Sequence, residues 1–156
     1  MKARQLEDGT IKTFNRVPKR LDKVIGGFDT LSDSELESFG LYDVVTPVIK
    51  NSQKLGAIEW NSQYSVFVYP VENKEFSQSL AEMKAEKIVA LKAIYGNELS
   101  KTDWIIIRDQ ELGNATDSDV LTARATLRTN CATKEEAING KTTKAYVADY
   151  SLPNFI

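Results

Sequence analysis

The feature that most constrains the fold is a change in apolar spacing near Glu75. From Glu75 to about Leu99, apolar side chains recur every three or four positions, the spacing of one face of an α-helix. Before Glu75, apolar residues form short runs separated by turn-forming residues, which is typical of strands. A single change from strand to helix patterning favours the α+β class over alternating strands and helices.

The sequence therefore predicts an α+β protein built from two modules. A small antiparallel β-rich N-terminal module is expected at residues 1–73, and a two-helix C-terminal module at residues 74–156. A chain of 156 residues is long enough for one compact domain or for two small modules.

Two hairpins are predicted in the first module. Residues 3–6 and 11–14 flank Asp8-Gly9, a strong turn signal that favours positive φ at both central positions. Residues 54–60 and 64–71 flank a polar three-residue turn. Both faces of the strand at 64–71 are apolar, which favours a central place in the sheet or a covering partner.

The segment between these hairpins carries helix and strand signals. Ser32 and Glu35 form the pattern of a capping box, and Gly40 is suited to a left-handed helix stop. A strand is predicted over residues 42–49, where Pro47 indicates an edge position or a bend.

In the second module, a helix over residues 75–99 is followed by an Asp103-Trp104 corner and the β-branched run 105–107. A second helix is predicted from Asp117 or Ser118 to about Ile138, ended by Asn139-Gly140. The first helix packs on its own sheet or joins a fibre coiled coil, and we favour the former because clean heptads are too few. On the second helix, the residues expected to face inward are Val120, Leu121, Leu127, Cys131 and Ala132.

The corner and the tail each have two interpretations. Trp104 is either a plug buried between the two helices or an exposed recognition residue, and we favour the plug. Arg108, Arg124 and Arg128 are expected to pair with Asp103, Asp109 or Glu111. Residues 144–156 form an apolar tail that either docks on a neighbouring subunit or folds back on its own core.

Composition argues against most enzyme classes. The chain has no histidine and one cysteine, Cys131, so triads based on histidine and zinc clusters are excluded. Carboxylate pairs such as Asp117 with Asp119 could in principle serve a small carboxylate-based hydrolase. That alternative is remote, because paired carboxylates at helix starts are usually caps. We expect no catalytic residues, no cofactor and no metal ion.

Charge and hydropathy bear on partners. The net charge of −2 and pI near 5.3 give no signature of nucleic-acid binding. Residues 1–23 are basic, and we interpret them as a solvated hairpin surface rather than a phosphate-binding arm. No apolar run is long enough for a membrane span and no secretory signal is present, so a soluble protein made in a reducing cytoplasm is expected.

The segment from Lys92 to Arg128 resembles the C-terminal segment shared by bacteriophage tail-assembly chaperones, tail-fibre assembly proteins and some fibre or tail-edge virion proteins. In that family a helix leads into Thr/Ser-Asp-Trp, then an acidic residue near leucine, then a helix with spaced arginines. The matching residues are Leu99, Thr102, Asp103, Trp104, Asp109, Glu111, Leu112, Arg124, Leu127 and Arg128.

The resemblance implies a non-enzymatic virion structural protein of the tail, fibre or collar apparatus, made in a host cytoplasm. The alternative is a tail or tail-fibre assembly chaperone that leaves the particle. The apolar link at 105–107 and the apolar tail favour the retained subunit, because a chaperone that leaves has little use for extra apolar segments.

Other phage tail or fibre proteins are the expected partners. The abundant apolar surface also predicts a homo-oligomer, a trimer if the protein belongs to a fibre. The residues predicted to make protein contacts are Phe67, Tyr69, Trp104, Tyr150, Phe155 and Ile156.

Overall fold

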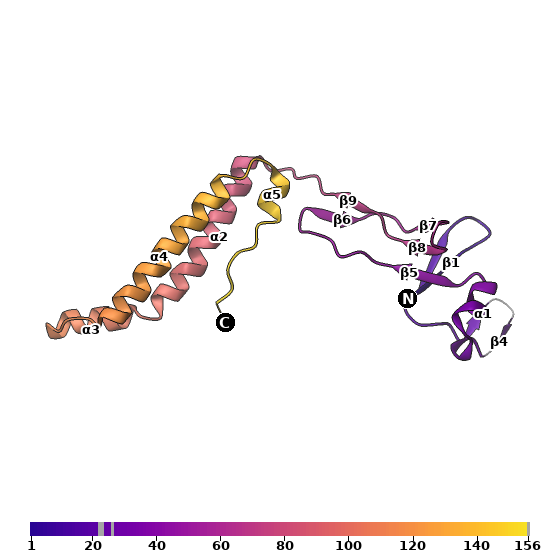
Figure 1. Ribbon diagram of the computed structural model, residues 1–156, viewed down its shortest axis with the longest axis horizontal. Helices are drawn as coiled ribbons and strands as arrows, with labels where there is room; N and C mark the ends of the chain where they lie inside the picture. The colour runs from indigo at the N-terminus through magenta and orange to yellow at the C-terminus, as the bar shows by residue number, and fades with distance from the viewer. Residues whose placement is uncertain (22–23, 26, 156) are drawn as a thin grey trace. The chain divides into compact units, whose positions relative to one another are not determined.

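The computed structural model describes residues 1–21, 24, 25 and 27–155, and divides the chain into two compact units (Figure 1). Met1–Lys74 holds the strands, and Glu75–Ile156 holds the long helices. The predicted α+β class is confirmed. The division falls one residue after the predicted boundary.

A five-stranded sheet forms the framework of the first unit, in the order β2-β1-β5-β8-β7. Its strands are β1 (Lys2–Gln5), β2 (Ile11–Phe14), β5 (Tyr42–Val45), β7 (Glu59–Asn61) and β8 (Val66–Val68). The pairs are antiparallel except β5 with β8, which is parallel. The predicted antiparallel sheet is therefore mixed, and β8 has the central place that its two apolar faces indicated.

The first hairpin closes through a different turn from the one predicted. Leu6 N–H donates to the Thr10 carbonyl, and Gly9 has φ +84° while Asp8 is not in the left-handed region. The Asp8 carboxylate instead accepts hydrogen bonds from the backbone N–H and hydroxyl of Thr10. A loop of this kind needs positive φ only at its glycine.

The second predicted hairpin is divided by a bulge. β7 pairs with β8, and the ribbon continues as β6 (Gln53–Leu55) paired with β9 (Val71–Asn73). Between the two pairs, residues 56–58 on one strand face only residues 69 and 70 on the other. Gly56 lies here because a Cβ would come within 3.0 Å of Pro70 Cγ and 2.5 Å of the Glu72 carboxylate. The expected long strands are thus two short pairs.

The segment 42–49 also ends earlier than predicted. β5 stops at Val45, two residues before Pro47, and lies inside the sheet rather than at its edge. Pro47 is therefore outside the ladder, where its missing N–H removes no strand hydrogen bond.

A small apolar core lies beside the sheet. It combines residues of β3 (Arg20–Leu21), the 3-10 helix η1 (Phe28–Thr30) and α1 (Asp33–Ser38), and β4 (Val24–Ile25) pairs with β3. Leu21, Phe28, Leu36 and Leu41 are buried together, with Phe14 packed against them. The predicted capping box of Ser32 and Glu35 is present, and Gly40 has φ +77°.

The second unit is a helical hairpin with two short additional helices. Its elements are α2 (Leu80–Ser100), α3 (Asp103–Leu112), α4 (Ser118–Asn139) and α5 (Lys144–Ala148). α2 packs against α4 and α5, and Leu91, Tyr95 and Ile138 form the buried centre. Figure 1 shows α2 and α4 side by side, with α3 and α5 at opposite ends of the hairpin.

Each of the two long helices begins directly after a capping residue, Ser79 for α2 and Asp117 for α4. α2 starts at Leu80 rather than near Glu75, because Ser79 and Glu82 form a capping box that the apolar spacing alone did not locate. α4 starts at Ser118 with Asp117 as its cap, as predicted. Some expectations were wrong. The run 105–107 is part of α3 rather than a link, and Leu121 and Ala132 are exposed rather than inward.

Candidate protein-contact surface on α3

Arg124 fixes the junction between α2, α3 and α4. Its guanidinium donates to the Leu99 carbonyl at 2.7 Å, to the Thr102 hydroxyl, and to the Asp103 carboxylate at 2.7 Å. The Arg124 side chain is largely buried, whereas Asp103 is half-exposed. One side chain of α4 therefore satisfies the last turn of α2 and the first turn of α3 together.

The ion pairs expected from the sequence are present in part. Arg124 pairs with Asp103, and Arg108 pairs with the buried Asp109 at 2.7 Å. Arg128 forms no ion pair with any residue that the structure describes.

The predicted burial of Trp104 is wrong, because its side chain is 58% exposed. Arg108 lies over its ring at 5.0 Å, a cation–π contact made at the surface. The indole is not a plug because the Arg124 hydrogen bonds, rather than apolar packing, hold the junction. Trp104 thus keeps the second of its two predicted roles, that of a residue available to a partner.

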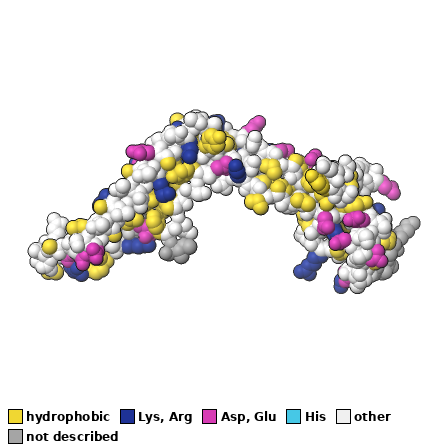
Figure 2. Space-filling model, in the orientation of Figure 1, with side chains coloured by type: hydrophobic (Ala, Val, Ile, Leu, Met, Phe, Trp, Pro, Cys, Tyr) yellow, Lys and Arg dark blue, Asp and Glu magenta, His cyan; other side chains and the backbone are white. Residues whose placement is uncertain are grey.

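Two further apolar side chains of α3 are exposed, Ile107 at 56% and Leu112 at 66%. At about 100° per residue, these two and Trp104 fall within roughly 140° of the helix circumference. Figure 2 shows hydrophobic side chains interspersed with charged ones at the α3 end of the helical unit. We call the set of Trp104, Ile107 and Leu112 the α3 face.

The segment that contains the α3 face is mostly acidic, although Arg108 lies over the Trp104 ring. Residues 98–121 carry six carboxylates and two basic side chains. Lys101 is paired with Glu98, Arg108 with Asp109, and Arg124 reaches in to Asp103. Among the residues that the structure describes, Glu111, Asp117 and Asp119 of this segment form no ion pair.

The other predicted contact residues are less available than Trp104. Phe67 is 2% exposed and packs edge-on against Trp60, its cross-strand partner, at 5.0 Å. Tyr69 is half-buried. Trp60 itself is 38% exposed. The sequence-based prediction missed it, although its place opposite Phe67 in a hairpin is a detectable signal.

The tail folds back on its own unit. Tyr150 and Leu152 pack against the cluster of Leu91, Tyr95 and Ile138, and the Phe155 ring meets the Tyr95 ring edge-on at 5.2 Å. Burial, with smaller contributions from Cys131 and Tyr150, raises the pKa of the Tyr95 phenol. Of the two predicted roles for the tail, the described residues adopt the second. Ile156 lies outside the described residues.

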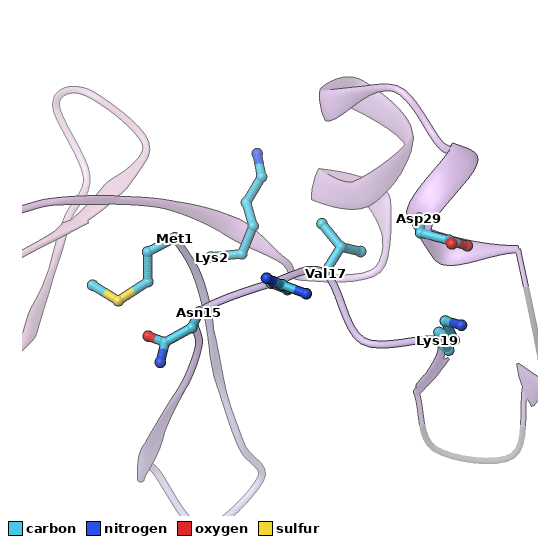
Figure 3. A pocket seen from close by; sticks show the side chains of 7 residues that line it. Met1, Lys2, Asn15, Val17, Lys19 and Asp29 are labelled. Atoms are coloured by element: carbon cyan, nitrogen blue, oxygen red, sulfur yellow. The ribbon is translucent and has the colours of Figure 1, made fainter.

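A hollow of about 550 Å³ in the first unit lies beside the basic N-terminal residues (Figure 3). It is lined by Met1, Lys2, Asn15, Arg16, Val17, Lys19 and Asp29. Lys2 is paired with Asp33 at 2.6 Å and Asp43 at 3.2 Å. Burial lowers the pKa of Lys2, but these hydrogen bonds outweigh it and the pKa lies above its ordinary value.

The hollow is lined by three cationic side chains, Lys2, Arg16 and Lys19, and by the carboxylate of Asp29. The carboxylates of Asp33 and Asp43 pair with Lys2. The interpretation of residues 1–23 as a hairpin surface stays a prediction.

Comparisons of the chain with protein-family models, curated proteins and solved structures found no match. Within the described ranges, no helix is long and apolar enough to span a bilayer. The same residues contain no group of three or more His, Cys, Asp or Glu side chains arranged to hold a metal ion. The α3 face and its Arg124 junction are therefore the features on which a functional proposal can be built.

Proposed function

We propose that this chain is a non-enzymatic structural protein of a bacteriophage tail, fibre or collar apparatus, acting through contacts with other proteins of that apparatus. The observation that carries the proposal is the α3 face, whose three large apolar side chains stand in solvent on one ten-residue helix. Single exposed apolar residues are ordinary, but a cluster of them on one short helix is typical of a contact surface.

The junction beneath the α3 face supports a contact role. Arg124 ties α3 to the hairpin by three hydrogen bonds, so the face is presented from an ordered base. A contact helix held in its bound orientation loses less conformational entropy on binding than a mobile one. Thr102 and Asp103, two residues of the Thr102-Asp103-Trp104 pattern that resembles the phage family, accept hydrogen bonds from Arg124 at this junction.

The proposed protein is made in the host cytoplasm and kept in the virion as a homo-oligomer, a trimer if it belongs to a fibre. A tail or fibre assembly chaperone that leaves the particle is the second candidate, favoured by the chaperones in the family that the segment resembles. A carboxylate-based hydrolase is the third and least favoured candidate function.

Quantitative mass spectrometry of purified particles separates the first two candidates. A retained subunit is expected at a fixed copy number per particle, whereas a chaperone is expected to be depleted to background. Light scattering of the isolated protein tests the oligomer, and a monomer at high micromolar concentration would count against it.

A pair of variants tests the surface itself. Trp104→Ser is expected to reduce incorporation into particles while the melting temperature hardly changes, because the indole is mostly exposed. Val89→Ser is the matched control, since Val89 is an exposed apolar residue on α2 of the same unit. Equal incorporation of the two variants and the unmodified chain would remove the α3 face from the proposal.

A further inference from the structure

Three aromatic side chains gather on one face of the sheet in the first unit. Phe67 of β8 pairs with Trp60 of β7 on one side and with Val44 of β5 on the other. Tyr42 is two residues from Val44, and side chains two residues apart on a strand project from the same face. The rings of Tyr42, Trp60 and Phe67 therefore lie together, with edge-on contacts between ring centroids 4.6 to 6.4 Å apart.

Gln5 brings an amide to the same face. Ala3 of β1 pairs with Tyr42, and Gln5 is two residues further along β1. The amide and the three rings surround a hollow of about 310 Å³, which is lined by Gln5, Gly40, Tyr42, Trp60 and Phe67. We call it the aromatic hollow. Its volume is at the lower end of the range of small-molecule sites, roughly 300–1,000 Å³.

The polar groups of the aromatic hollow are available to a ligand. The Trp60 indole N–H and the Tyr42 hydroxyl form no hydrogen bond with any residue that the structure describes. The Gln5 amide N–H donates to the Gly9 carbonyl at 3.3 Å, and its oxygen is left as an acceptor. Trp60 is 38% exposed and Tyr42 is half-buried, so a ligand can reach both donors.

Charge does not contribute to the aromatic hollow. Among the residues that the structure describes, none that lines it is charged. The Arg4 side chain passes within 4 Å of the position that a Cβ on Gly40 would take, but it lines a different hollow together with Glu7 and Asp8. A charged ligand would therefore lose its hydration in the aromatic hollow without gaining a counter-ion in the lining.

A purely apolar ligand also fits the lining poorly. It would displace water from the Trp60 N–H, the Tyr42 hydroxyl and the Gln5 amide without replacing the hydrogen bonds of that water. A sugar ring meets both demands, because its C–H groups pack on aromatic rings and its hydroxyls both donate and accept hydrogen bonds. The lining offers donors and acceptors together, which matches hydroxyl groups better than a ligand that only accepts.

We propose that the aromatic hollow binds an uncharged sugar ring. The C–H groups of the sugar pack against the rings of Trp60 and Tyr42, above the buried Phe67. Its hydroxyls bond with the Gln5 amide, the Tyr42 hydroxyl and the Trp60 N–H. This inference goes beyond the proposed function, because it concerns the first unit and a ligand that is not a protein.

A titration of the full chain followed by NMR tests the site. The chain has two tryptophans, Trp60 and Trp104, and each gives one indole N–H signal, so Trp104 is an internal control. The probes are maltohexaose, cellohexaose and chitohexaose, which are uncharged, and hexagalacturonic acid, which is acidic. At least one uncharged probe is expected to shift the Trp60 signal alone, with a dissociation constant of about 1 mM or below and at least about tenfold tighter than the acid.

Three variants locate the binding. Trp60→Ala is expected to weaken it by about tenfold or more, read from the backbone amide signal of Gly40. Gln5→Ala is expected to weaken it by about fivefold, and this exposed position keeps the test valid if loss of Trp60 disturbs the packing of Phe67. Tyr64→Ala is the matched control, because Tyr64 is a 68% exposed aromatic residue of the same unit outside the aromatic hollow. Its affinity is expected to equal that of the unmodified chain.

Several results would overturn the sugar site. One is an unmoved Trp60 signal with all three uncharged probes at about 10 mM, and another is an equal shift of Trp60 and Trp104. Unchanged affinity in Gln5→Ala, or an equal loss in Tyr64→Ala, would also overturn it. Binding of a proline peptide of about ten residues without any response to the sugars would assign the aromatic hollow to a proline-rich segment instead. The particle experiment decides the proposed function independently of these results.

Discussion

At the scale of single residues, Arg124 decides how the helical unit is built. Its guanidinium donates to Leu99 of α2, to Asp103 of α3 and to Thr102 between these helices. Its side chain is only 10% exposed. Removing it would take the Arg124 donor from the Thr102 hydroxyl and the Asp103 carboxylate, whereas the Leu99 carbonyl would still accept from the hydroxyl and N–H of Thr102. Unpaired polar groups at a buried junction are costly, so this arginine is a structural requirement of the α3 face.

Arg124→Ala is expected to lower the free energy of unfolding by about 2 kcal/mol, a moderate value because Asp103 is half-exposed and partly screened. Arg128→Ala, one turn further along α4, is the matched control and is expected to change stability by less than about 0.5 kcal/mol. Urea unfolding of both variants measures the difference. Equal losses in the two would show that Arg124 does not hold the junction.

A second residue-scale prediction concerns the cap of α2 and its pH dependence. Hydrogen bonds from the Ser79 backbone N–H and side chain, with a smaller contribution from Lys144, hold the pKa of Glu82 below its ordinary value. The stabilisation from a carboxylate with a lowered pKa is present above the unfolded-state pKa of glutamate, 4.5, and is lost as pH falls through the folded-state pKa.

Ser79→Ala is therefore expected to raise the pKa of Glu82 and, near neutral pH, to cost about 1 kcal/mol from loss of the hydroxyl cap. The stability difference from the unmodified chain is expected to shrink below the pKa of Glu82. An NMR titration of the Glu82 carboxyl and urea unfolding at neutral and acid pH measure both effects. Ser77→Ala, an exposed serine just before the cap, should show neither; a matching loss there would contradict the cap assignment.

At the scale of elements, the tail is part of the helical core. Leu152 packs against the α2–α4 cluster, and the Phe155 ring contacts the Tyr95 ring. The hairpin of α2 and α4 alone would expose this apolar surface, so the tail and α5 serve as its third layer. Val147 of α5, 1% exposed, packs inward in the same unit.

Deleting residues 151–156 is expected to lower the free energy of unfolding of the helical unit by about 2 kcal/mol. The deletion removes the packing of Leu152 against the α2–α4 cluster and the contact between the Phe155 and Tyr95 rings. Deleting only residues 155 and 156 should cost less than half of that, since Leu152 remains. Thermal and urea melts compare the two truncations. A six-residue deletion with an unchanged midpoint would mean that the tail does not stabilise its own unit.

At the scale of the whole molecule, the chain consists of two units with separate apolar cores. One core is built around Phe28 and Leu41, and the other around Leu91 and Ile138. Units with their own cores are expected to open in separate steps, because a change in one core leaves the packing of the other unaltered. Each unit is also small, so each depends on a few buried side chains.

Leu91→Ala is expected to cost about 3 kcal/mol in the helical unit, since Leu91 is fully buried there. Hydrogen exchange read by mass spectrometry should show faster exchange in Glu75–Ile156 and unchanged exchange in Met1–Lys74. Phe28→Ala provides the reciprocal case, with the effect confined to the first unit. Equal acceleration of both units by either variant would contradict separate cores.

Sequence patterns alone determined the features that depend on neighbours a few residues apart. The α+β class, the first hairpin, the Ser32–Glu35 capping box and the Asp117 start of α4 all follow from such local interactions. The pairing of Arg124 with Asp103 was also among the expected ion pairs. Trp104 was among the residues predicted to make protein contacts.

Only the tertiary structure decided which surfaces are covered. The parallel pairing of β5 with β8 joins segments about twenty residues apart and has no local signature. The sequence pattern allows either a buried or an exposed Trp104. In the structure the buried Arg124 holds the junction and Trp104 is exposed. The tail's return to Tyr95 is settled in the same way, since burial depends on which distant side chains meet and not on the order of residues along the chain.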